Sequence, residues 1–109
     1  MAKAIFYQKP GMIDYKNATE AAIEANTIIV LGSRIGVAGC SIAVGEIGTL
    51  HVEGIFKMPK TGGAINAGAE VYFDGSGITG TSGEGTTKAG FAAAAAAAND
   101  TEVLVALNA

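Results

Sequence analysis

The sequence predicts a mainly β fold, a small single-domain barrel or sandwich with short Gly-rich turns. Short apolar stretches are bounded throughout by Gly, Pro, Asn or Thr, which is typical of a strand-rich chain. From Leu50 to Met58, apolar residues alternate with mostly polar ones, which is the period of a β-strand. The 16 glycines supply residues for tight turns. At 109 residues, the chain is expected to form one domain spanning residues 1–109.

Nine stretches combine apolar character with flanking turn residues and are predicted as strands. They are Ala4–Gln8, Met12–Lys16, Thr27–Leu31, Ile35–Val37, Ser41–Val44, Thr49–Met58, Glu70–Asp74, Thr87–Ala92 and Glu102–Leu107. Alternation predicts that Val103, Val105 and Leu107 share one face of the last strand. Pro59 marks the end of the long strand, because proline is poorly tolerated inside a central strand.

Two segments have some helical character. Asn17–Asn26 is barely three turns long, and a repeat of its sequence elsewhere argues against a helix there. The seven alanines from Ala92 to Ala98 favour helix by propensity, but the run is too short for a stable isolated helix or a membrane span. We expect one or two helical turns at most between the last two strands. This corner is either a tight subunit contact or a plain surface connector.

Three segments repeat a common pattern of Ile, any residue, Ala or Val, and then Gly or Asn, followed by a strand. They are Ile23–Asn26, Ile42–Gly45 and Ile65–Gly68. Gly and Asn tolerate the positive φ that tight turns require. The pattern therefore predicts repeated units of a turn followed by a strand, in too few copies for a solenoid.

No pattern in the chain indicates catalysis, a cofactor or a metal. Gly75, Gly77 and Gly80 have the spacing of a dinucleotide-binding loop, but no helix-forming sequence follows them, so a hairpin loop is expected. His51, the one histidine, is expected at a surface or subunit contact, and Cys40 is expected to be a small buried residue. Glu53 and Glu70 are expected on solvated faces.

Charge and composition exclude several classes of partner. Seven basic and ten acidic residues give a net charge of −3, and the basic residues are scattered, so neither DNA nor RNA is expected as a direct partner. No stretch predicts membrane insertion. The N-terminal sequence lacks the apolar core of a signal peptide, and a single cysteine allows no internal disulfide, which together indicate synthesis in a reducing cytoplasm.

Five stretches, taken in order, resemble the small capsid cement, or head decoration, proteins of tailed bacteriophages and prophages. They are MAKAIFYQKPGMIDYKNAT, AAIEANTIIVLGSRIGVAG, IGTLHVEGIFKMPK, AINAGAEVYFD and VLVALN. The most specific are Gly48–Lys60 and AGAEVYFD. The resemblance implies a structural virion protein that binds the major capsid protein on the outside of the shell. It also implies a homotrimer that reinforces the shell against packaged DNA after synthesis in the host bacterial cytoplasm.

The resemblance carries no residue-level binding motif, so the interface is inferred from the chain itself. The N-terminal residues Ala2, Lys3, Ile5, Phe6 and Tyr7 combine an exposed charge with apolar and aromatic anchors and form the candidate capsid or subunit contact. The same residues are alternatively the first strand of their own domain. Two other functions stay open: a small-ligand-binding β-barrel, expected to have an aromatic-lined cavity, and a non-catalytic accessory domain.

Overall fold

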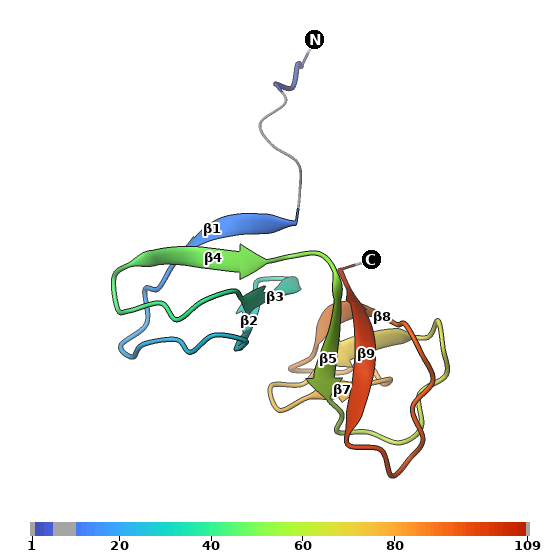
Figure 1. Ribbon diagram of the computed structural model, residues 1–109. Coiled ribbons are helices and arrows are strands. Elements are labelled where there is room, and N and C mark those ends of the chain that lie inside the picture. The colour runs from blue at the N-terminus through green and yellow to red at the C-terminus, as the bar shows by residue number, and fades with distance from the viewer. Residues whose placement is uncertain (1, 6–10, 109) are drawn as a thin grey trace.

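The computed structural model describes residues 2–5 and 11–108 and contains nine β-strands in this part of the chain (Figure 1). They are β1 (Met12–Lys16), β2 (Ile28–Leu31), β3 (Arg34–Ala38), β4 (Ile47–His51), β5 (Ile55–Pro59), β6 (Glu70–Phe73), β7 (Ile78–Thr79), β8 (Thr87–Ala92) and β9 (Glu102–Leu107). None of the described residues is helical, so Asn17–Asn26 forms a loop and the alanine run contains no helical turn. The prediction of a mainly β domain is confirmed.

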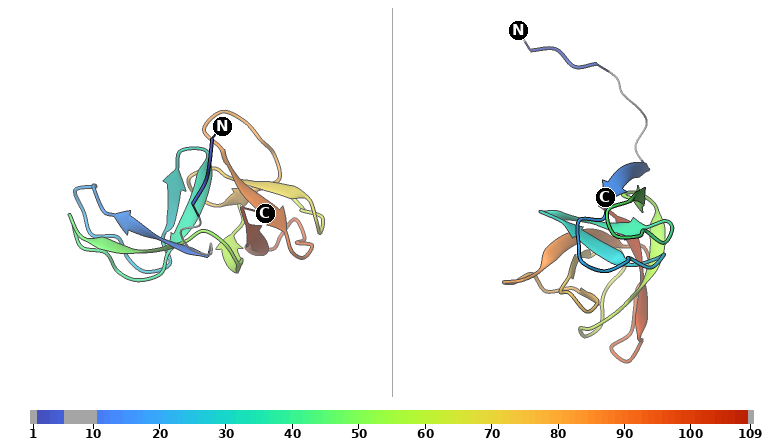
Figure 2. Two further views of the ribbon diagram at one scale, coloured as in Figure 1. Left: turned by 90° about the horizontal axis from the view of Figure 1, so that it is seen from above. Right: turned by 90° about the vertical axis from the view of Figure 1, so that its left-hand side faces the viewer.

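The strands form two antiparallel sheets that lie side by side (Figures 1 and 2). The first sheet has the order β1-β4-β3-β2, and the second has the order β5-β9-β8-β6-β7. An isolated bridge between Lys60, which follows β5, and Ile78 of β7 joins the two edges of the second sheet at one point. The sheet is therefore curved, but it does not close into a continuous barrel. Of the two predicted forms, the structure therefore fits the sandwich.

Three predicted strands have the predicted bounds, and three other predictions are wrong or only partly tested. β1, β8 and β9 match. The long strand Thr49–Met58 is broken, because the chain turns at Gly54 (φ 120°) and passes from the first sheet to the second. Ser41–Val44 forms only an isolated bridge at Ile42, followed by a turn. In Ala4–Gln8, the first two residues are not in a strand and the other three lie outside the described residues.

The two sheets are two copies of one unit. β1, β4, β3 and β2 of the first sheet correspond in order and direction to β5, β9, β8 and β6 of the second. Equivalent backbone hydrogen bonds recur: Val52 N–H donates to the Gly11 carbonyl at 2.9 Å, and Leu107 N–H donates to the Gly54 carbonyl at 2.8 Å. The main difference is β7, which lies in the longer connection between β6 and β8.

The repeated turn pattern belongs to this duplication, and it has a fourth copy that the sequence prediction missed. Ile23 pairs with Ile42 in the first unit, and Ile65 pairs with Ala96 in the second. Ala96 lies inside the alanine run and is buried. The run is therefore the fourth bridge-and-turn segment, with small side chains where the other copies carry isoleucine.

The main core lies between the two sheets and on the inner face of the second sheet. Leu50 of the first sheet and Val105 of the second are equivalent in the repeat. We call the face of each sheet that carries this residue its inner face, and the opposite face its outer face. The predicted face of β9 is confirmed, since Val103, Val105 and Leu107 are all buried. Ile35 and Val37 of β3 join the core from the first sheet. Burial of this kind contributes about 25 cal/mol per Å² of apolar surface.

Equivalent positions after β1 and β5 hold the bridge segments in place by different chemistry. Asn17 is fully buried, and its Nδ2 donates to the carbonyl oxygens of Ala21 at 2.9 Å and Ile42 at 3.0 Å. In the second unit, Lys60 Nζ donates to the carbonyl of Ala98 at 3.1 Å, and to those of Gly62 and Asp100. Both side chains therefore add hydrogen bonds to carbonyl oxygens of the bridge segments, and at Ile42 this bond adds to the one from the Ile23 amide.

Candidate interaction surface

Within residues 2–5 and 11–108, no three His, Cys, Asp or Glu residues are placed to hold a metal ion. His51 ends β4, and its ring centroid lies 5.7 Å from that of Phe56 at a tilt of 49°, so it packs across the link between the sheets. Glu53 and Glu70 are both exposed, as expected for solvated faces. Within the described residues, no helix is long and apolar enough to cross a membrane.

The prediction that Cys40 is buried is wrong. Cys40 is exposed and lies in the bend where the chain leaves β3. The next inward-facing residue is Ile42, which pairs with Ile23 and occupies the space above Gly48 that a Cβ at that glycine would need. Since the isoleucine fills the interior of this corner, the thiol two residues earlier remains at the surface.

Of the three glycines with dinucleotide-loop spacing, Gly75 and Gly77 lie in the turn between β6 and β7, in agreement with the expected hairpin loop, and Gly80 follows β7. The Asp74 carboxylate accepts hydrogen bonds from the Ser76 and Gly77 amides at 2.8 and 2.9 Å and from the Thr61 hydroxyl at 2.7 Å. These bonds, led by that of Thr61, lower the pKa of Asp74. A Cβ at Gly77 would lie 2.7 Å from the Pro59 carbonyl oxygen. The loop therefore uses its glycine for close backbone approach.

A hollow of about 220 Å³ lies at the seam between the two units. It is lined by Ser33, Arg34, Lys88 and Asn108. Asn108 is held there because its Nδ2 donates to the carbonyls of Ile35 and Val52, both at 2.9 Å. This polar lining differs from the aromatic-lined cavity expected of a ligand-binding barrel.

Three of the five predicted interface residues fall within the described chain. Ala2, Lys3 and Ile5 are all exposed, and Ile5 exposes 93% of its surface. The segment Ala2–Ile5 lies well away from both sheets (Figures 1 and 2). Phe6 and Tyr7 lie outside the described residues. The described part of this N-terminal arm therefore offers an apolar side chain that its own domain does not bury.

A second exposed apolar surface was not predicted, and we call it the outer patch. It lies on the outer face of the second sheet, where Ile55, Ala106 and Phe91 are neighbours across β5, β9 and β8. Ile55 is 64% exposed, and Phe91 and Leu104 are each 38% exposed. The signal was present in the sequence, because isoleucine, phenylalanine and leucine occupy positions that alternation assigns to the solvent face. Contiguous apolar surface of this kind marks protein–protein contacts.

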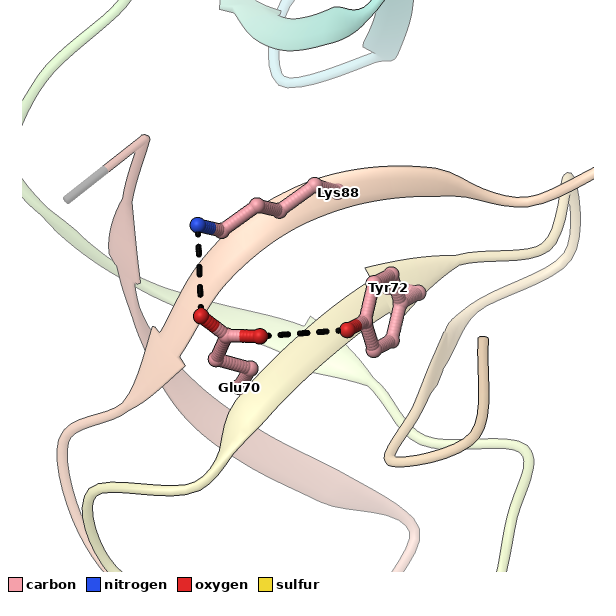
Figure 3. Close-up of polar contacts among 3 residues, drawn as sticks. All are labelled: Glu70, Tyr72 and Lys88. Carbon is pink, nitrogen blue, oxygen red and sulfur yellow. Dashed lines mark hydrogen bonds and ion pairs between the residues drawn. The ribbon is translucent and has the colours of Figure 1, made fainter. Parts of the chain in front are cut away.

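Polar side chains of β6 and β8 border the outer patch on one side. Figure 3 shows the Lys88 ammonium 3.4 Å from one carboxylate oxygen of Glu70, while the Tyr72 hydroxyl donates to the other at 3.2 Å. Because these groups are exposed, the ion pair contributes little to stability. An apolar centre with a polar rim is the usual arrangement of a protein interface.

Comparison with known families identifies the kind of protein that carries these surfaces. The sequence model of the phage cement protein family matches residues 7–107 of the 109-residue chain. The chain belongs to the phage cement protein family. This cement protein is therefore a capsid-associated structural protein of a phage virion, and its family is of a structural, non-enzymatic kind. Neither the curated proteins nor the solved structures contain a match to it.

Proposed function

We propose that this cement protein binds the outer surface of an assembled phage capsid as a homotrimer and reinforces the shell against the pressure of packaged DNA. Its partner there is the major capsid protein, and it reaches the virion after synthesis in the host bacterial cytoplasm. The observation that carries the proposal is the family match over residues 7–107. The outer patch and the N-terminal arm supply two separate contact surfaces.

Two surfaces are needed because a cement protein must hold neighbours together. The outer patch supplies apolar contact area with a polar rim, and the arm supplies an extended segment able to pair with a sheet edge. Weak single contacts suffice on a lattice, since each one raises the effective concentration of the next. We assign the outer patch to the capsid and the arm to assembly.

Replacing Ile55 by lysine tests the outer patch. We expect Ile55→Lys to lower the affinity for heads assembled without the protein by about tenfold or more, because a charge placed in an apolar contact must be desolvated. Co-sedimentation with heads measures the affinity. Val44→Lys is the matched control, since Val44 is 54% exposed but lies in a turn of the first unit. Equal binding by both variants would remove the patch from the interface.

Deleting residues 2–7 tests the arm. We expect a folded protein that no longer decorates heads or protects them from heat, because Ala2–Ile5 buries nothing in its own domain. Circular dichroism and a melting curve measure folding, and co-sedimentation measures decoration. Normal decoration by the truncated protein would show that the arm is dispensable. Loss of folding would show instead that the segment is part of the domain's own core.

A further inference from the structure

The inner face of the first unit is open where that of the second unit is closed. Four inner-face residues of the second unit are at most 9% exposed: Met58, Ile65, Val71 and Phe73. Their equivalents in the first unit are only half-buried: Tyr15, Ile23, Ile29 and Leu31. Ile13 beside them is 37% exposed. We call these five first-unit residues, which surround the buried Leu50, the open groove.

β7 contributes to this difference, together with Ile35 and Val37 of the first sheet, which pack into the core of the second unit. In the second unit, residues 74–86 join β6 to β8, and β7 within them pairs with β6. Ile78 of β7 pairs with Phe73, is fully buried and covers the inner face. In the first unit, only Gly32 and Ser33 join β2 to β3. Among the described residues, no strand pairs with the other edge of β2.

The duplication therefore specifies what would fill the open groove. The missing piece is a short extended segment that adds to β2 as β7 adds to β6, with one isoleucine directed onto the inner face. β7 is only two residues long, so two residues of strand are enough. In β7, the isoleucine follows the small residue Gly77. Main-chain pairing at the edge with a side chain in the groove is the usual mode of strand addition.

The N-terminal arm has these properties. Its isoleucine, Ile5, is 93% exposed and is not buried by its own domain. Ala2–Ile5 is exposed and contains no strand, so its backbone groups are available to pair. We propose that the arm of one copy adds to β2 of a second copy, with Ile5 opposite Leu31 in the place that Ile78 takes opposite Phe73. This proposal rests on the proposed function, and it names the receiving site of the arm.

The arrangement of the sheet favours a second copy over the chain's own arm. The chain enters the first sheet at β1, and the order β1-β4-β3-β2 places the receiving strand at the opposite edge. Figures 1 and 2 show Ala2–Ile5 directed away from the sheet. Because arm and groove are different surfaces, the contact is heterologous and is completed only in a closed ring. A ring of three copies satisfies every arm and every groove.

Cysteine pairing between two separately purified variants tests the exchange. Each variant carries Cys40→Ser, and one then carries Ile5→Cys while the other carries Leu31→Cys. Mixed in the absence of capsids and oxidised, they are expected to form a disulfide-linked heterodimer, identified by mass spectrometry of the linked peptides. The control replaces Leu31→Cys with Val44→Cys, an exposed turn position. We expect about a tenfold higher heterodimer yield than in the control, since docking raises the effective concentration of the two thiols.

The outcomes separate this inference from the proposed function. A heterodimer yield equal to that of the Val44 control overturns arm exchange, whether or not the protein binds heads. A disulfide formed only within a doubly substituted chain, Ile5→Cys with Leu31→Cys, shows that each arm fills its own groove and also overturns it. Normal decoration of heads alongside either result leaves the cement function in place. Melting curves of all variants confirm that each is folded.

Discussion

Replacing Gly90 by alanine is expected to lower the free energy of unfolding by about 3–5 kcal/mol, a large part of the stability of an ordinary domain. Gly90 lies in β8 with φ 138°, a region that residues with a side chain rarely adopt. A Cβ there would overlap the carbonyl oxygen of Ala106 on the neighbouring strand. Because that oxygen belongs to the backbone, β8 and β9 must separate to relieve the overlap. Urea unfolding followed by circular dichroism measures the loss.

The matched control is Gly83→Ala. Gly83 is exposed, no atom lies within 4 Å of the position of its Cβ, and its φ is outside the left-handed region. There we expect no loss and a gain of up to about 1 kcal/mol, because alanine restricts the unfolded chain. A free energy of unfolding for Gly90→Ala within 1 kcal/mol of the parent protein would contradict the proposed close approach of β8 and β9.

Replacing Asn17 by alanine is expected to cost about 2–4 kcal/mol. Its amide is fully buried and bonds in both directions: Nδ2 donates to Ala21 and Ile42, and Oδ1 accepts from the Thr19 amide at 3.0 Å. Removing the side chain takes away these hydrogen bonds and empties the buried space, while the Ile42 carbonyl keeps its bond from the Ile23 amide and the Ala21 carbonyl keeps its bond from the Thr19 hydroxyl. Denaturant unfolding gives the magnitude, and hydrogen exchange at the Ile23 and Ile42 amides should show the loosened bridge.

Asn66→Ala controls for the loss of an asparagine side chain. Asn66 lies in the equivalent turn region of the second unit, where it is exposed and its backbone carbonyl alone accepts the Ala69 amide. We expect its effect to stay within about 0.5 kcal/mol, as is usual for surface positions. If the two substitutions cost the same, the buried amide of Asn17 does not hold the first bridge in place.

Local sequence was sufficient to place several strands and one buried face. Apolar stretches bounded by turn residues placed β1, β8 and β9 with correct bounds, and alternation put Val103, Val105 and Leu107 on the buried side. Turn-forming glycines and asparagines also revealed three of the four bridge segments. The fourth was hidden, because Ala96 takes the place of an isoleucine inside a run of alanines and lacks the bulk that makes the pattern visible.

The interface was only partly predictable. The arm stands out in sequence through the exposed charge and apolar anchors of residues 2–7. The outer patch required strand registry, because Ile55, Phe91 and Leu104 lie far apart in the chain and become neighbours only when β5, β9 and β8 pair. The open groove required more, since Ile29 and Leu31 differ from Val71 and Phe73 in exposure and not in chemical type.

The sequence alone was enough to predict a mainly β class, three of the four turn segments and the relation to the cement proteins, because these depend on residue type and on spacing along the chain. The tertiary structure alone decided that the chain changes sheets at Gly54 and folds as two copies of one unit. Alternation continues in phase across that glycine, so periodicity cannot reveal a change of partner. The packing of the first sheet against the second and the pairing of β7 with β6 close the inner face of the second unit and leave that of the first unit open.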